Sequence, residues 1–312
     1  MRANSDCIRP ARPASVCVSL VNKLSARETT SITISPDGQT LASSYGKTIQ
    51  LWDLNTSKPL TMLAGHSNWV TAITFSRQGK TLASSSLDKT IRLWDLDTAK
   101  LLSTFDAGRM TTLAFSPDGR MLASGSRNHL WSDGQLGSSG VQLWDLKTGK
   151  QLLTFGSGQV TSLAFSPNGE VLATGSSNTQ LWNLKTGQLL YTLDSGQLTT
   201  LAFNPDGQTL VTGSSKLKVW DVSTGKLVYT LNSGSSDLAL SPDGETLAVS
   251  SGSTIHIWQL KTGKFLGAFR GSWYSNLSVV FGLDGHSLIT SSSDGINIWR
   301  PHRLIFSGAL GG

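Results

Sequence analysis

The chain has 312 residues, of which 38% are hydrophobic and only 15% charged, with 32 glycines and two cysteines. This hydrophobic content argues against wholesale disorder, and two cysteines are too few for a disulfide-dense scaffold. No run of ~18 apolar residues occurs, so the sequence predicts no membrane-spanning helix and no membrane partner.

The net charge of +6 is concentrated at the two ends of the sequence. Residues 1–30 carry +3 and residues 300–312 carry +2, which leaves +1 for residues 31–299. Binding to phosphate backbones needs clustered Lys and Arg, so the nearly neutral body argues against a nucleic-acid partner. We interpret residues 1–15 as a basic, flexible tail and residues 302–312 as a second tail or an extra outer strand.

The first apolar patch, residues 16–21, is too short for a secretory signal. Cys7 and Cys17 lack the partners that a zinc site needs. We therefore expect a cytoplasmic protein with free thiols, and we expect residues 16–21 to form an outer β-strand.

Seven segments of similar sequence follow, each ending in tryptophan. They read IQLW, IRLW, VQLW, TQLW, LKVW, IHIW and INIW, and end at Trp52, Trp94, Trp144, Trp182, Trp220, Trp258 and Trp299. An SPDG-like turn precedes each tryptophan by about 15 residues, and a TGK-like turn follows most of them. Residues 160–193 show the pattern of one repeat, because four short β-rich runs alternate with turns of Pro, Gly and Asn. Four short strands per ~40 residues predict radial blades or a solenoid.

Strand alternation favours blades. In IRLW, Ile91 and Leu93 face one side of the strand, and Arg92 and Trp94 face the other. Because both faces carry bulky side chains, each sheet must be covered on both sides. Neighbouring blades of a β-propeller provide that cover.

At this point the chain resembles the WD-repeat β-propeller family, and its regularity resembles bacterial members. Aspartate follows the tryptophan at Asp53, Asp95, Asp145 and Asp221, and is replaced by Asn183, Gln259 and Arg300 in the other three repeats. The resemblance implies an all-β fold, a seven-bladed propeller of four-stranded antiparallel blades over residues 16–301. A terminal strand should complete the last blade. We favour residues 16–21 for this role, with residues 306–310 as the alternative.

The second repeat alone matches the family's hydrogen-bonded tetrad, at His66, Ser86, Asp88 and Trp94. The resemblance implies a structural role for these residues rather than a catalytic triad. Repeats three to six have shorter turns in place of Gly-His and lack the aspartate, so we expect their blades to depend more on apolar packing.

The sequence offers little for catalysis. None of the five histidines pairs with another at metal-ligand spacing, and no nucleophile elbow, P-loop or dinucleotide fingerprint is present. We therefore expect no enzyme activity, no metal and no cofactor.

Binding is the remaining function, and the connections between repeats differ most where a partner could bind. The family resemblance places the d–a and b–c loops on one face of the propeller. Loops on a rigid scaffold carry function, and aromatic and Arg side chains dominate binding hot spots. The candidate partner-binding residues, which form one arc over the seventh, first, second and third blades, are Tyr45, Trp69, Arg127, His129, Trp131, Asp133, Trp273 and Tyr274.

The predicted function is a non-catalytic scaffold, monomeric alone, that binds a protein or peptide partner on this face. Two alternatives stay open. One is a sensor or small-ligand propeller that uses the central channel, for which a buried Asp237 would argue. The other is a regulatory module of a larger signalling system.

Overall fold

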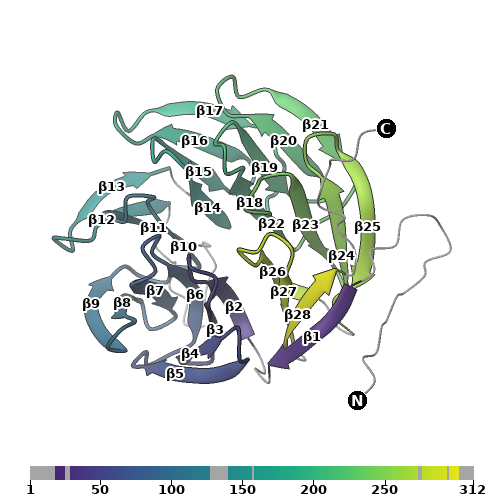
Figure 1. The fold of residues 1–312 in the computed structure, drawn as a ribbon. Coiled ribbons are helices and arrows are strands. Elements are labelled where there is room, and N and C mark those ends of the chain that lie inside the picture. Colours follow the sequence, from purple (N-terminus) through teal and green to yellow (C-terminus); the bar gives the residue numbers. More distant parts are fainter. Residues whose placement is uncertain are drawn as a thin grey trace, which may run out of the picture.

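The computed structural model describes residues 18–24, 29–126, 140–156, 158–272, 276–293 and 295–301, and the regular structure of these residues is β-strand throughout. The strands form seven four-stranded antiparallel sheets arranged as blades around a central channel (Figure 1). The all-β, seven-bladed propeller predicted from the repeats is confirmed. The proposed tails at residues 1–15 and 302–312 lie outside the described residues.

Within each blade we call the strands a to d from the channel outward. Blades 1 to 3 consist of β2 Thr29–Ile34, β3 Thr40–Tyr45, β4 Thr48–Asp53 and β5 Lys58–Ala64; β6 Val70–Phe75, β7 Thr81–Ser86, β8 Thr90–Asp95 and β9 Lys100–Asp106; and β10 Thr112–Phe115, β11 Met121–Gly125, β12 Val141–Asp145 and β13 Gln151–Phe155.

Blades 4 to 6 repeat this order. They consist of β14 Ser162–Phe165, β15 Val171–Gly175, β16 Thr179–Asn183 and β17 Leu189–Leu193; β18 Thr200–Phe203, β19 Thr209–Gly213, β20 Leu217–Asp221 and β21 Leu227–Leu231; and β22 Asp237–Leu240, β23 Thr246–Ser251, β24 Thr254–Gln259 and β25 Lys264–Arg270.

Blade 7 joins the two ends of the described chain. It consists of β26 Asn276–Phe281, β27 Leu288–Ser292, β28 Gly295–Pro301 and β1 Val18–Leu24. Strand β1 pairs antiparallel with β28, from Val18 opposite Pro301 to Leu24 opposite Ile296. The expected N-terminal closure is therefore present, with β1 extending to Leu24 beyond the expected residues 16–21, and Figure 1 shows β1 beside β28.

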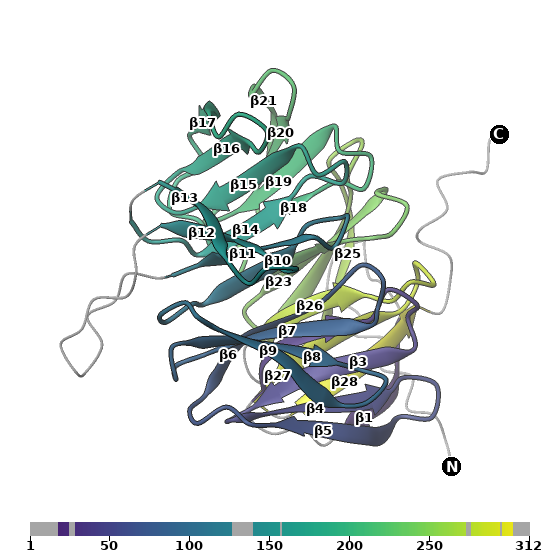
Figure 2. The ribbon, with the colours of Figure 1, turned by 90° about the vertical axis from the view of Figure 1, so that its left-hand side faces the viewer.

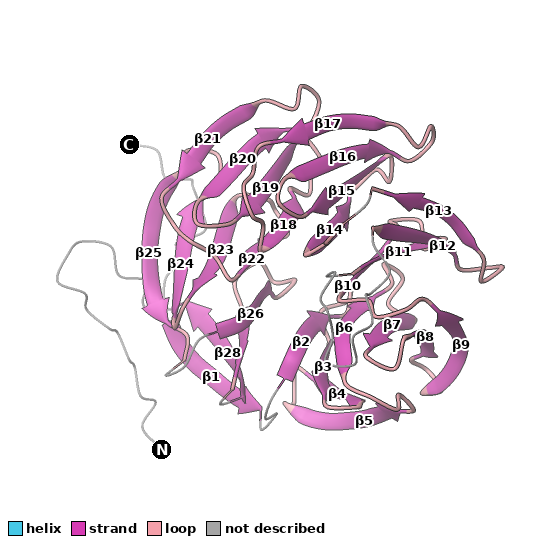
Figure 3. Ribbon diagram, turned by 180° about the vertical axis from the view of Figure 1, so that it is seen from behind, coloured by secondary structure: helices cyan, strands magenta, loops and turns pink. Residues whose placement is uncertain are grey.

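The ring is closed by contacts between neighbouring blades. Each a strand contacts the a strands of both adjacent blades, including β2 against β26. The apolar core lies between blades, in seven clusters. The cluster between blades 1 and 2, for example, joins Ile49 and Leu63 to Ile73, Leu82 and Trp94. Both faces of each sheet are thus buried, as the alternation predicted. Figure 2 shows the ring from the side with β9 in front, and Figure 3 shows it from behind.

Antiparallel order places the connections at two opposite ends of the blades. We call the end with the d–a and b–c connections, such as residues 65–69 and 46–47, the loop face. We call the end with the a–b and c–d turns, such as residues 35–39 and 54–57, the turn face.

Candidate functional site

Two of the predicted partner-binding residues are described, and both are exposed on the loop face. Tyr45 ends β3 and is 51% exposed, and Trp69 precedes β6 and is 44% exposed. The main chain at Trp69 is held in place, because its carbonyl accepts a hydrogen bond from Leu87 N–H at 2.9 Å. The indole therefore projects into solvent from a fixed backbone. The remaining candidates Arg127, His129, Trp131, Asp133, Trp273 and Tyr274 lie outside the described residues.

A buried polar network lies behind Trp69 in blade 2. Trp94 Nε1–H donates to Ser84 Oγ at 2.8 Å, and Ser84 Oγ lies 2.8 Å from His66 Nε2. His66 Nδ1 lies 2.8 Å from Asp88 Oδ2. The consistent assignment is a neutral histidine whose Nδ1–H donates to Asp88 while Nε2 accepts from Ser84. The network joins strand c to the d–a connection.

The electrostatics of this network match that assignment. Burial lowers the pKa of His66, more than the hydrogen bond to Asp88 raises it. Burial alone would raise the pKa of Asp88, but hydrogen bonds from Thr90, His66 and the main chain outweigh burial and lower the pKa to about 2. At neutral pH the pair therefore consists of a neutral imidazole and a carboxylate that is 4% exposed, too enclosed to meet a substrate.

The serine of this network differs from the one predicted. Ser84, and not Ser86, lies between His66 and Trp94. Ser86 Oγ instead donates to the carbonyl of Asn68 at 3.0 Å and accepts from Asp88 N–H at 3.0 Å, so it shapes the b–c turn. Both serines share one strand face, because they are two residues apart in β7. Only their distance along the strand separates their roles.

Part of the network is present in blades that lack the histidine. The strand-c tryptophan donates to a hydroxyl of strand b in six of the seven blades, with these pairs and distances: Trp52–Ser43 2.8 Å, Trp94–Ser84 2.8 Å, Trp144–Ser124 2.9 Å, Trp182–Thr174 3.1 Å, Trp220–Thr212 2.9 Å and Trp299–Thr290 2.9 Å. In blade 6, Val249 occupies the hydroxyl position opposite His256. Trp258 Nε1 is correspondingly buried and has no partner among the described residues.

One carboxylate enters the channel. Asp237, on β22, accepts hydrogen bonds from Thr200 Oγ1 of blade 5 at 3.2 Å, and from Ser278 Oγ at 2.8 Å and Val279 N–H at 3.0 Å, both of blade 7. Burial raises the pKa of Asp237, and these hydrogen bonds oppose the rise only in part. The carboxyl lines a channel hollow of about 440 Å³ together with Thr200 and Ser278. It joins three consecutive blades.

A larger hollow lies on the loop face over blades 4 to 6. We call it the basin. Its volume is about 990 Å³, and its lining residues are mostly hydroxyl-bearing or glycine, with two lysines. The charged members are Lys216 and Lys218, both in blade 5. The loops of these blades carry mainly small polar residues. The sequence prediction relied on aromatic residues and therefore placed the partner site on the opposite side of the ring. The shortened turns of blades 4 to 6 were the available signal for the basin.

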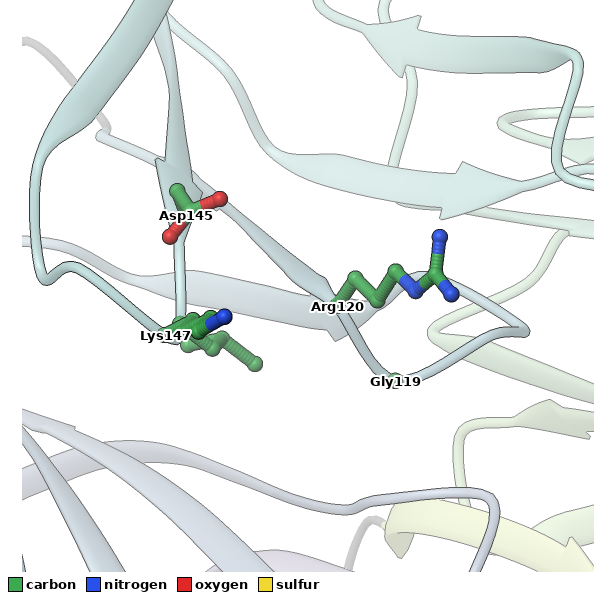
Figure 4. Close-up of a pocket in the computed structure, with 5 residues that line it drawn as sticks. Gly119, Arg120, Asp145 and Lys147 are labelled. Carbon is green, nitrogen blue, oxygen red and sulfur yellow. The ribbon is translucent and has the colours of Figure 1, made fainter.

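The turn face carries a separate shallow hollow in blade 3. It is lined by Gly119, Arg120, Asp145, Leu146 and Lys147, and Figure 4 shows Arg120 extending away from Asp145. Asp145 accepts from the N–H and the hydroxyl of Thr148, each at 2.7 Å, and these bonds lower its pKa. The carboxylate is thus occupied in forming its turn.

The described residues also bear on metal binding and on membrane crossing. No cluster of three His, Cys, Asp or Glu side chains that could hold a metal ion occurs within them. Nor do they include a helix with the length and apolar character needed to cross a membrane.

Comparison with known proteins finds WD40 repeats in this chain. The family model described as "WD domain, G-beta repeat" matches residues 19–53, 57–95, 99–136 and 225–259. These matches cover most of β1 and the strands of blades 1 and 2, and they include parts of blades 3, 5 and 6. A second model, "Eukaryotic translation initiation factor eIF2A", matches residues 129–235.

Three curated proteins show the range of relatives. Autophagy-related protein 16 of Arabidopsis thaliana is 31% identical over 32% of this chain and 22% of its own length. The U3 small nucleolar RNA-associated protein 15 homolog of Xenopus tropicalis is 31% identical over 31% of this chain and 19% of its own length. The target of rapamycin complex subunit wat1 of Schizosaccharomyces pombe is 49% identical over 18% of each.

The chain thus spans about a fifth of the length of these curated relatives. All three are eukaryotic, so the comparisons do not support the bacterial resemblance suggested by the regular repeats. Proteins of WD40 repeats are typically non-catalytic scaffolds, in keeping with the polar networks described above, which are used for structure. The chain carries WD40 repeats within a closed seven-bladed β-propeller, which supports its place in the WD-repeat family.

Proposed function

We propose that this protein is a non-catalytic interaction scaffold that binds a protein or peptide partner on its loop face. The observation that carries the proposal is the exposure of Tyr45 and Trp69 at the loop ends of adjacent blades. Large aromatic side chains on a rigid backbone lose little conformational entropy on binding, and they dominate many interface hot spots. The candidates at 127–133 and 273–274 extend this proposed arc. We also propose a cytoplasmic location and a monomer in the absence of the partner.

The test is capture of partners from a native lysate with matched baits. One bait carries Tyr45→Ala with Trp69→Ala, a second lacks residues 128–139, and a control carries Met62→Ala. Met62 is 56% exposed on the outer strand β5 of blade 1, so its variant also loses exposed apolar area, but away from the loop face. All baits must first show the thermal unfolding of the wild type.

Support would be a protein that wild type and the Met62 variant capture and the two loop-face variants lose. Equal capture by all four baits would contradict the proposal and move the binding site to another surface.

A second candidate is a small-ligand or sensor role for the channel, favoured by Asp237. Its carboxyl is partly buried where it lines the hollow of the channel, and burial raises its pKa. Differential scanning fluorimetry tests this role by measuring the thermal unfolding of wild type and Asp237→Asn with each member of a library of small cations and polar metabolites. A ligand that stabilises wild type and fails to stabilise the variant would support it, and the absence of any such ligand would argue against it.

A further inference from the structure

We propose that the basin over blades 4 to 6 binds an acidic segment of the protein partner, one that carries carboxylate or phosphate groups. This inference rests on the proposed function and adds to it the chemistry of the partner and a second contact region. The basin lies across the ring from Tyr45 and Trp69, at the mouth of the channel (compare blades 1 and 2 with blades 4 to 6 in Figure 1).

The basin lies where a repeated apolar side chain is replaced by serine. At the start of the inner strands of blades 1 to 6 one residue lies between neighbouring blades, and in blade 1 this residue is the buried Thr29. In blades 2, 3, 4 and 5 it is buried and apolar: Val70, Met110, Val160 and Leu198. The equivalent residue of blade 6 is Ser235. We call this the plug position.

Hydrogen bonds establish this equivalence. The N–H groups of Val70, Leu198 and Ser235 each donate to a main-chain carbonyl of the preceding blade. The carbonyls of Val70, Met110 and Ser235 each accept from the hydroxyl of a threonine in that blade. Ser235 therefore has the backbone geometry of a plug and lacks its apolar bulk.

Short connections enlarge the opening. Five residues, 65–69, connect β5 of blade 1 to Val70, and they include His66 and the exposed Trp69. Three residues, 195–197, connect Asp194 to the plug Leu198, and two residues, 233–234, connect Asn232 to Ser235. The d–a connection of blade 2 is thus longer than those before the inner strands of blades 5 and 6, and it carries the buried His66.

The charge of the basin determines the chemistry of its occupant. Among the described residues that line it, Lys216 and Lys218 are charged and none is acidic. Lys216 is exposed. Lys218 Nζ donates to the carbonyl of Asp194 and lies 5.7 Å from the centre of the Trp220 ring. These contacts orient the ammonium without neutralising it, so the complementary ligand is an anion.

The size and lining of the basin favour a peptide segment over a free ion. About 990 Å³ is at the upper end of the ~300–1,000 Å³ typical of ligand sites. Hydroxyls of Ser236 and Ser251, the amide of Gln197, and the main chain at Gly196 and Gly234 line it. Such groups can hydrogen-bond the main chain of an extended segment, while the two lysines pair with its acidic side chains.

The experiment selects binders from a random octapeptide library displayed on phage. Wild type is compared with Ser235→Leu, which places in blade 6 the side chain that blade 5 has at Leu198. Ser235→Val, which copies the side chain of Val160 in blade 4, is the second plug variant in case Leu does not fold. Lys216→Ala with Lys218→Ala removes the charge, and Lys226→Ala on the turn face is the control for loss of a lysine.

We expect peptides selected on wild type to be enriched in Asp and Glu over the input library. Their affinity should fall about tenfold or more in the double-lysine variant and in the folded plug variant, and stay unchanged in Lys226→Ala. Binding should weaken at higher salt, because the paired charges are exposed. Replacing the selected Glu or Asp by phosphoserine separates the two sources of negative charge.

Two results would overturn the inference. One is the absence of acidic enrichment among peptides selected on wild type. The other is binding of those peptides by the plug and double-lysine variants with the affinity of wild type. The proposed function would be unaffected by either, provided that lysate capture still depends on Tyr45 and Trp69. If lysate capture did not depend on Tyr45 and Trp69 while acidic peptides still bound in the basin, the aromatic site would be contradicted and the basin inference would be supported.

Discussion

Blade 6 offers a direct measurement of what the tryptophan–hydroxyl bond contributes to stability. Val249 stands where six other blades have Ser or Thr, and Trp258 Nε1 is buried without a partner among the described residues. Val and Thr are nearly equal in volume, so Val249→Thr adds an acceptor without a cavity. Its own O–H can donate to the carbonyl of His256, as Thr212 does to Lys218 at 3.4 Å.

The reverse change in blade 5 is the matched partner. Thr212→Val leaves Trp220 Nε1 buried and unpaired, which costs about 1–3 kcal/mol. Val249→Thr gains at most the net value of one hydrogen bond, about 0.5–1.5 kcal/mol, less the cost of burying the new hydroxyl. We therefore expect a gain of about 0.5 kcal/mol in blade 6 and a loss of about 1.5 kcal/mol in blade 5.

Urea unfolding monitored by far-ultraviolet circular dichroism measures both changes, since ten tryptophans complicate fluorescence. The slopes must agree between variants for the midpoints to report stability. A neutral Thr212→Val, or a Val249→Thr that destabilises the protein by more than about 1 kcal/mol, would refute the assigned role of the hydroxyl.

Two further predictions concern the carboxyls of Asp88 and Asp237. Asp88→Asn should cost about 1–3 kcal/mol at pH 7, because the amide cannot accept all the bonds from Thr90, His66 and the main chain. With a folded pKa of about 2, the carboxylate's stabilisation is complete above its ordinary pKa and lost as pH falls toward 2, so wild type and variant should converge in acid unfolding curves. The pH dependence of stability that comes from Asp237 has the opposite sign. Because its pKa is raised, its ionisation destabilises the folded state, and this destabilisation is absent in acid and grows as pH rises. Asp237→Asn should therefore raise the urea midpoint more at pH 7 than at pH 4, and an equal or larger gain at pH 4 would show that burial of the charge is not the cause.

The repeats contained most of the information for the fold. Seven tryptophans that recur along the chain, with a turn before and after most of them, predicted four short strands per repeat, and the resemblance to the WD-repeat family implied seven antiparallel blades. Strand alternation predicted that the core lies between the sheets. Closure by an N-terminal strand could be anticipated because the apolar residues 16–21 precede the first a strand, although the exact register of β1 depends on pairing with β28.

The site was harder to predict, for physical reasons. Ser84 and Ser86 lie on the same strand face, so sequence alternation could not decide which meets His66. The basin arises from what is missing at Ser235, and a search for chemically distinctive residues passes over a small serine among small neighbours. Its signal is visible only when the inner strands are compared blade by blade, where an apolar series ending in serine indicates an opening.

The pairing of β1 with β28 also has a consequence for the order of folding. The first strand of the described chain, β1, pairs with its last, β28, so this contact spans almost the whole described chain and carries a large loop-closure entropy. Until β28 emerges, Val18 and Leu24 have no strand to cover them, and the first and sixth blades each present an unmatched apolar face. A nascent chain of six blades is thus an open arc whose two end blades each expose an apolar face that could aggregate. Completion of the seventh blade buries both faces at once.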